Sequence, residues 1–134
     1  MKQDSRSHQR FLHFQKAFGS LSEAIIQENL NELEQNGLIQ RFEFTLELAW
    51  KTLKDFLEEE WFEVHSPKET IRQAFHAGYI SDAQVWIDMI DIRNAFSHDY
   101  DGHFFHEKES FLRNEVYGAM WELLRFFTEK IKNG

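Results

Sequence analysis

Apolar residues recur three and four positions apart along most of this sequence, and that spacing constrains the fold more than any other feature. Such residues line one face of an α-helix. The 134 residues include only one proline and six glycines, the residues that interrupt helices. No alternating apolar and polar pattern typical of a strand competes with this spacing. We therefore predict an all-α fold.

The first half of the chain is predicted to form a helical hairpin. An apolar stripe places the first helix over about residues 7–32, and Asn36-Gly37 is expected to close it. The second helix is predicted over about residues 38–61. The first stripe consists of Phe11, Phe14, Phe18, Leu21 and Ile25. The second consists of Phe42, Leu46, Ala49, Leu53 and either Phe56 or Leu57.

The second half is predicted to contain one short helix and two longer ones. Ser-Pro-Lys-Glu at residues 66–69 has the spacing of a capping box and should start the short helix, which ends near Gly78. Residues 81–84 repeat that spacing and should open the fourth helix. The last helix is predicted over about residues 104–131. The expected architecture is an antiparallel four-helix bundle with one additional short helix, in a single domain over residues 1–134.

Composition narrows the class of protein. The sequence contains no cysteine, which excludes disulfides, thiolate metal sites and a cysteine nucleophile. The formal net charge is −8, with a net of +3 over residues 1–17 and −8 over residues 23–63. This balance is unlike that of a general nucleic-acid binder, so any contact with RNA must use local positive charge. With no apolar run long enough to span a membrane, we expect a soluble cytoplasmic protein.

Residues 93–100 combine a cation, an imidazole, a hydroxyl, a carboxylate and a phenol. Cleavage of RNA without a metal requires groups that move protons and a positive charge that stabilises the phosphate. Arg93 and His98 are suitable types, and they are our candidate catalytic residues. A spacing of five would place them about 140° apart on a regular helix. Either the helix ends or distorts near Ser97, or a second subunit completes the site.

The neighbouring polar residues admit two interpretations. In the functional one they orient the histidine or hold the phosphate, and they are Asn94, Ser97 and Asp99. In the structural one, Arg93 forms an ion pair with a nearby carboxylate, and Asn94, Ser97 and His98 terminate a helix. The carboxylates that are near in sequence are Asp88, Asp91 and Asp99.

Helix two carries a polar strip formed by Arg41, Glu43, Glu47 and Lys51, in which Glu43 and Glu47, and Glu47 and Lys51, are four residues apart. Residues four apart are neighbours on a helix, and the Glu47–Lys51 order stabilises it. This strip either forms an exposed ladder of ion pairs or projects Arg41 and one glutamate toward Arg93 and His98 or toward a partner.

We expect neither a metal nor a cofactor. The imidazoles and carboxylates near the motif lack a recognised ligand spacing and span a glycine-containing turn; they are His98, Asp99, Asp101, His103 and His106. The sequence also has no Gly-rich phosphate loop.

Two motifs resemble a known family. Arg93-x-x-x-x-His98-x-Tyr100 resembles the signature of the HEPN superfamily, which includes metal-independent ribonucleases. The segment QRFEFTLELAWK over residues 40–51 is similar to the second helix of HepT-like proteins, also called nucleotidyltransferase substrate-binding proteins. The resemblance implies a minimal nucleotidyltransferase as partner and paired motifs in a homodimer cleft. It also implies that Tyr100 accepts a transferred nucleotide.

Three functions follow from these patterns. The first is a HepT-like subunit of a two-component module, of toxin–antitoxin type, with a metal-independent ribonuclease site at its homodimer interface. The second is a non-catalytic subunit that presents RNA, a nucleotide or another substrate to the nucleotidyltransferase. The third is a structural dimerisation bundle, for which the fourteen phenylalanines and four tryptophans provide apolar surface.

Overall fold

The computed structural model describes residues 5–98 and 103–133, and within these residues every regular element is helical. The helices in chain order are α1 (Arg6–Ile25), α2 (Glu32–Glu59), α3 (Pro67–His76), α4 (Ala83–Phe96), α5 (His103–Ser110), the π-helical segment η2 (Phe111–Val116) and α6 (Tyr117–Asn133). Across the described ranges, none of these helices is long and apolar enough to cross a membrane.

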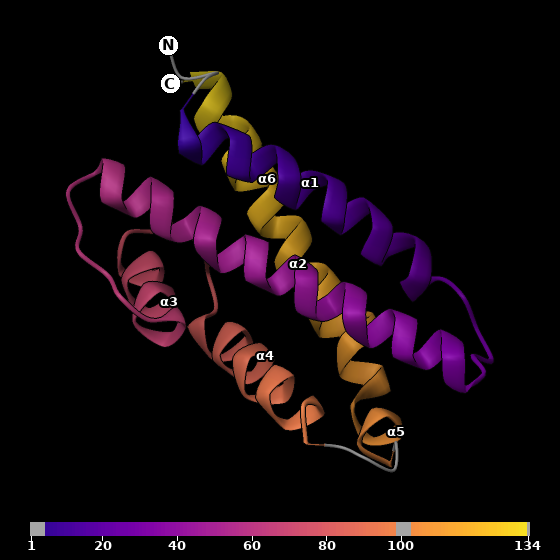
Figure 1. The fold of residues 1–134 in the computed structure, drawn as a ribbon. Coiled ribbons are helices and arrows are strands. Elements are labelled where there is room, and N and C mark those ends of the chain that lie inside the picture. Colours follow the sequence, from indigo (N-terminus) through magenta and orange to yellow (C-terminus); the bar gives the residue numbers. More distant parts are fainter. Residues whose placement is uncertain (1–4, 99–102, 134) are drawn as a thin grey trace.

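The long helices form an antiparallel bundle, as Figure 1 shows. Helices α1 and α2 lie side by side as a hairpin, and α6 runs behind them. Helix α4 packs along the opposite flank of α2 from α1, and the short α3 packs against the end of α2. The predicted all-α bundle with one additional short helix is therefore confirmed.

The core combines aliphatic side chains with aromatic rings from α1, α2 and α6. Phe127 is fully buried; its ring centroid lies 4.6 Å from that of Phe56 in a stacked pair and 6.0 Å from that of Phe11 in an edge-on pair. Aromatic pairs of these geometries add about 0.5–1.5 kcal/mol each beyond the burial of their surface. All positions of the two predicted stripes are buried, including both Phe56 and Leu57.

The prediction for the first turn was wrong. Helix α1 ends at Ile25, and residues 36–37 lie inside α2. The reason is a capping box: the Asn31 side chain accepts a hydrogen bond from the Glu34 amide, and the Glu34 carboxylate accepts one from the Asn31 amide. Asn29 supplies the reversal at φ 56°, a left-handed conformation that asparagine tolerates.

The starts of α3 and α4 show one prediction confirmed and one corrected. Ser66 caps α3 by accepting from the Glu69 amide at 3.2 Å, as the spacing predicted. Helix α4, in contrast, is capped by Asp82 rather than by Ser81. The Ser81 hydroxyl instead donates to the Glu122 carboxylate of α6 at 2.8 Å, which connects the α3–α4 loop to the last helix.

The predicted last helix contains an unpredicted π-helical segment. One helical run extends from α5 through η2 to α6, and Arg113 lies within η2. Its guanidinium donates to the Glu109 carboxylate at 2.9 Å and to the backbone carbonyl of Ile25. Since Ile25 ends α1, this bond satisfies one of the carbonyl groups that a helix end leaves without a partner.

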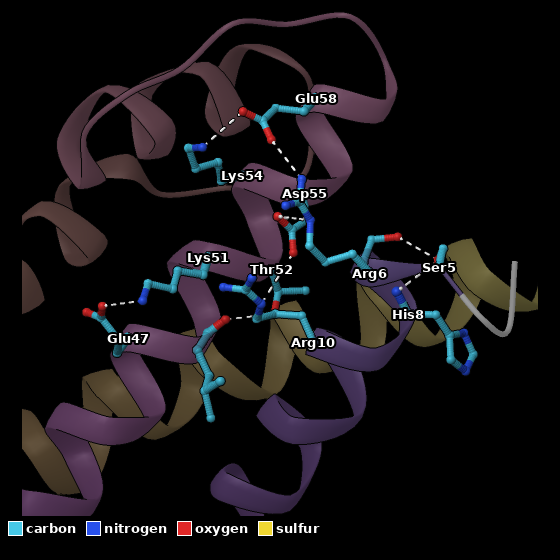
Figure 2. A network of polar contacts seen from close by, with 12 residues as sticks. Ser5, Arg6, His8, Arg10, Glu47, Lys51, Thr52, Lys54, Asp55 and Glu58 are labelled. Carbon is cyan, nitrogen blue, oxygen red and sulfur yellow. Dashed lines mark hydrogen bonds and ion pairs between the residues drawn. The ribbon is translucent and has the colours of Figure 1, made fainter.

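The uneven charge distribution has a structural explanation, visible in Figure 2. The guanidinium of Arg10 lies 3.4 Å from the carboxylate of Asp55, and that of Arg6 lies 3.8 Å from Glu58. The basic start of α1 thus neutralises part of the acidic α2. Burial raises the pKa of Asp55, whereas the charges of Arg10 and Arg6 act in the opposite direction.

Candidate functional site

Arg93 lies in the last turn of α4 and reaches across to α2. Its Nη1 donates to Oε1 of Glu47 at 2.8 Å, and 24% of the Arg93 side chain remains exposed. A cation in the last turn also interacts favourably with the helix dipole. The contact joins the two segments that carry the family resemblance, although they are 46 positions apart.

The sequence-adjacent carboxylates do not hold this arginine. Asp91 forms an ion pair with Lys68 of α3, with its Oδ1 2.7 Å from the lysine Nζ. Asp88 accepts a hydrogen bond from the Gln84 side chain at 2.9 Å. The structural interpretation therefore named the wrong partner in both cases, and Asp99 lies outside the described residues.

Glu47 is the centre of a small hydrogen-bonded cluster. Its Oε1 accepts from Arg93 and from Nε1 of Trp50 at 3.1 Å, and its Oε2 lies 3.0 Å from Nζ of Lys51, a contact drawn in Figure 2. Partial burial acts to raise its pKa, but the bonds from Lys51 and Trp50 and the charges of Lys51 and Arg93 outweigh burial and lower the pKa. Glu47 thus remains ionised and orients Arg93.

Sequence analysis missed Trp50 in this cluster. Its indole N–H requires a partner when the ring is partly buried, and Glu47 is three residues away on the same helix face. The spacing of three between Glu47 and Trp50 could have predicted this hydrogen bond.

Glu43 lies one turn before Glu47, close enough for the charge of Arg93 to act on it. Burial raises the pKa of Glu43, and the positive charge of Arg93 offsets only part of this effect. The two glutamates on this side of α2 therefore differ in how readily they give up a proton.

Arg41 does not join this cluster. Its Nη1 donates to the backbone carbonyl of Ser20 in α1 at 3.0 Å, on the opposite flank of α2. Of the predicted polar strip, Glu43, Glu47 and Lys51 thus lie on the α4 side, whereas Arg41 faces α1. The expectation that Arg41 projects toward Arg93 was wrong, and a contact with a partner stays a prediction.

The regular helix ends between Arg93 and His98. Helix α4 ends at Phe96, Ser97 is its C-cap, and the Ser97 hydroxyl donates to the Asn94 carbonyl at 2.6 Å. His98 and Asn94 are exposed, and no hydrogen bond or ion pair joins Arg93 to His98 in residues 5–98. The helix end near Ser97 was one of the two expected arrangements.

Aromatic packing connects the end of α4 with α2 and α5. The ring of Phe96 packs edge-on against Phe42 of α2, with centroids 6.3 Å apart, and against Phe104 of α5, with centroids 5.1 Å apart. Asp99 and Tyr100, predicted as a supporting residue and a nucleotide acceptor, lie outside the described residues between Phe96 and Phe104. Their roles stay predictions.

Within the described part of the chain, no group of three or more histidine and carboxylate residues is placed to hold a metal ion. Two of the five residues considered as ligands from the sequence, Asp99 and Asp101, lie outside that part.

The geometry leaves Arg93 able to bind an anion. Arginine has five N–H donors, and in the described residues only its Nη1 has a protein partner. The remaining donors can form bonds to a phosphate while Glu47 holds the side chain. His98 is exposed to solvent, and imidazole is a side chain of the type that transfers protons in catalysis.

Two solved structures share this fold. A crystal structure of a Thermus thermophilus protein is 32% identical, with a TM-score of 0.77, over 84% of this chain and 98% of that one. A Haemophilus influenzae structure, described as revealing the fold of a substrate-binding domain of a nucleotidyltransferase, is 25% identical with a TM-score of 0.70. That match covers 86% of this chain and 96% of the other.

The sequence comparisons agree with the structural ones. A Haemophilus influenzae protein named as a probable ribonuclease HepT is 36% identical over 70 residues, which are 48% of this chain. The chain spans about half of that relative's length, since the match covers 48% of it. The family described as nucleotidyltransferase substrate-binding protein like matches residues 9–126, a range that includes the α1–α2 hairpin and the Arg93–Glu47 contact. This chain belongs to that family.

Proposed function

We propose that this protein is a metal-independent endoribonuclease subunit that partners a nucleotidyltransferase. One observation supports the proposal most strongly. Glu47 binds Nη1 of Arg93 and leaves the other guanidinium N–H groups without a partner among the described residues, and Arg93 lies at the helix end that precedes the exposed His98. The probable ribonuclease HepT of Haemophilus influenzae supports the same activity.

The two residues divide the chemistry between them. The ribose 2′-oxygen attacks the adjacent phosphorus as its proton is removed, and the bond from phosphorus to the 5′-oxygen breaks. The departing oxygen takes up a proton, and the products end in a 2′,3′-cyclic phosphate and a 5′-hydroxyl. His98 transfers protons, and Arg93 stabilises the phosphate as its negative charge increases.

A homodimer gives this reaction its second proton-transfer group. One group must accept a proton and another must donate one, whereas a single motif supplies one imidazole. Two copies facing each other would supply two, with Asn94, Ser97 and Asp99 as supporting residues.

The partner follows from the family. The family description and the Haemophilus influenzae structure both name a nucleotidyltransferase. We propose a two-component, toxin–antitoxin module in which that enzyme transfers a nucleotide from a nucleoside triphosphate to the phenol oxygen of Tyr100. The phenol loses its proton, pyrophosphate leaves, and the modified nuclease is inactive. Cleavage of cellular RNA would place the module in the cytoplasm.

The test is cleavage of RNA by the purified protein in EDTA, beside an oligonucleotide of the same sequence made of DNA. We expect cleavage of the RNA alone, with 2′,3′-cyclic phosphate ends, because DNA lacks the attacking hydroxyl. Cleavage of DNA at a similar rate, or cleavage that depends on added Mg²⁺, would refute the mechanism.

A second function, a non-catalytic subunit that presents RNA or a nucleotide, is favoured by the substrate-binding description of the Haemophilus influenzae structure. Co-expression with the nucleotidyltransferase from the neighbouring reading frame separates the two. A stable complex without any RNA cleavage would support the binding subunit, and cleavage by the isolated protein would support the nuclease.

A further inference from the structure

A basic groove lies between α1 and α2, on the flank of α2 opposite to Arg93. Its volume is about 450 Å³. The long side chains along its walls are His13 and Lys16 of α1 and Arg41 and Phe44 of α2.

Small residues on its floor explain why the groove exists. The hydroxyl oxygen of the buried Thr45 lies 2.6 Å from the backbone carbonyl oxygen of Arg41 in its own helix and 3.2 Å from that of Ala17 in α1, so the two helices approach closely here. Neither Ala17 nor Thr45 has a side chain long enough to fill the space between the walls. The groove is therefore a consequence of residue size at the helix contact.

The cations of the groove are not neutralised as those at the start of α1 are. Arg6 and Arg10 form ion pairs with acids of α2. By contrast, no ion pair to Lys16 or Arg41 forms among residues 5–98 and 103–133, and the bond from Arg41 goes to a carbonyl. In a chain of net charge −8, this is a local positive region.

The positive region has a limit. Glu23 and Glu34 line the adjacent hollow, on the other side of Arg41 along the hairpin. Any anionic ligand would therefore extend from Arg41 toward Lys16 and His13, away from these carboxylates.

An exposed aromatic ring completes the surface. Phe44, on the wall of the groove, is 63% exposed. Proteins that bind single-stranded nucleic acid combine a basic groove, which follows the phosphates, with aromatic side chains on which bases stack. The groove contains both components.

Phe44 lies on α2 between Arg41 of the groove and Glu47 of the candidate catalytic cluster. Arg41, Phe44 and Glu47 are spaced three residues apart on α2. Each of them is therefore rotated by about 60° around the helix axis from the one before it, and shifted by about 4.5 Å along the axis. Arg41 lines the groove, and Glu47 holds Arg93. Phe44 thus lies between the groove and Arg93 on the outer face of α2.

We propose that this groove binds single-stranded RNA and guides it to Arg93. Lys16 and Arg41 contact phosphates, and a base stacks on Phe44 where the strand crosses α2. The proposal rests on the proposed ribonuclease function, whose substrate it would position. It explains how a protein with net negative charge holds RNA.

The test measures binding of a fluorescent single-stranded RNA of about 12 nucleotides, within the range of known single-strand sites. Methylated 2′-oxygens prevent cleavage during the measurement, and anisotropy is recorded at several salt concentrations. The variants are Lys16→Gln and Phe44→Ser. The matched controls are Lys132→Gln in the last turn of α6 and Phe75→Ser, an exposed phenylalanine of α3.

The two groove variants should weaken binding in different ways. Lys16→Gln should reduce the slope of log K against log salt by about 0.7, the value for one phosphate contact on a single strand. Phe44→Ser should weaken binding about fivefold or more without changing that slope, because stacking does not release counterions. Both control variants should bind as the wild-type protein does.

Equal affinity of groove and control variants would overturn the proposal. So would groove variants that retain RNA binding but no longer bind the nucleotidyltransferase, since the groove would then be a protein interface. Failure of the ribonuclease function is distinguishable: the wild-type protein would leave RNA intact, while the groove variants would still lose affinity for methylated RNA.

Discussion

The ion pair between Arg93 and Glu47 should couple α2 to α4 by about 1 kcal/mol. At a nitrogen–oxygen distance of 2.8 Å, Coulomb attraction in water is about 1.5 kcal/mol, and a lower local dielectric increases it. The side chains are 24% and 39% exposed, so solvent screening and lost side-chain entropy reduce the net value. The bonds that Trp50 and Lys51 donate to Glu47 keep the carboxylate in place and limit the entropy lost.

A double-mutant cycle measures this coupling. Urea unfolding of the wild-type protein, Glu47→Gln, Arg93→Met and the double variant, all at one protein concentration and pH 7, gives four free energies of unfolding. The pKa of Glu47 is lower in the folded protein than its ordinary value of 4.5. The stabilisation that the Glu47 charge provides is therefore present above pH 4.5, and it is lost as the pH falls through the pKa of the folded protein. The coupling should therefore weaken as the pH is lowered and Glu47 takes up a proton.

A coupling energy below about 0.3 kcal/mol at pH 7 would refute this reasoning, because distant and independent sites add to within that error. A coupling that stays unchanged as the pH is lowered until Glu47 is protonated would show that the carboxylate charge is not its source. A Lys68→Gln and Asp91→Asn cycle provides a matched control for another contact of α4. That pair, with side chains 41% and 55% exposed, should couple more weakly.

Three further perturbations test the fold and the site. Glu43→Gln should stabilise the protein at neutral pH, because burial raises the pKa of Glu43 and disfavours its charged form. In urea unfolding, the difference in stability between this variant and the wild-type protein should vanish as the pH falls through the raised pKa of Glu43. Phe127→Ala should cost about 3–5 kcal/mol in the same assay, whereas the exposed Phe75→Ala should change stability by less than about 0.5 kcal/mol. Asn31→Ala should cost about 1 kcal/mol by removing the α2 cap, and Asn36→Ala, inside α2, should not destabilise; the reverse order would contradict the observed helix start.

The helices could be predicted because the residues that a helix buries are apolar and recur three or four positions apart in the sequence. The stripe from Phe11 to Ile25 is buried throughout, and the cap at Ser66 was readable from four consecutive residues. The first turn was not predicted correctly, since Asn36-Gly37 is a strong local turn signal. Burial of Leu38 and the capping box at Asn31 outweigh that signal.

The site was predictable in its residue types but not in its contacts. Local spacing suggested Asp88 or Asp91 as the partner of Arg93, whereas the carboxylate that binds it is 46 positions away. Only the packing of α4 on α2 brings Glu47 within reach. Arg41 shows the same limit: it is two residues before Glu43, which places it about 200° around the helix, and it therefore faces α1.

The most direct test of the central claim is the rate of RNA cleavage in EDTA by the wild-type protein, Arg93→Ala and His98→Ala, under single-turnover conditions. Lys132→Gln serves as a control that leaves the site unchanged. We predict that each site substitution slows cleavage by about 100-fold or more, as expected for loss of a proton-transfer group or of the charge that stabilises the phosphate. Cleavage at the wild-type rate by both variants would contradict the assignment of Arg93 and His98.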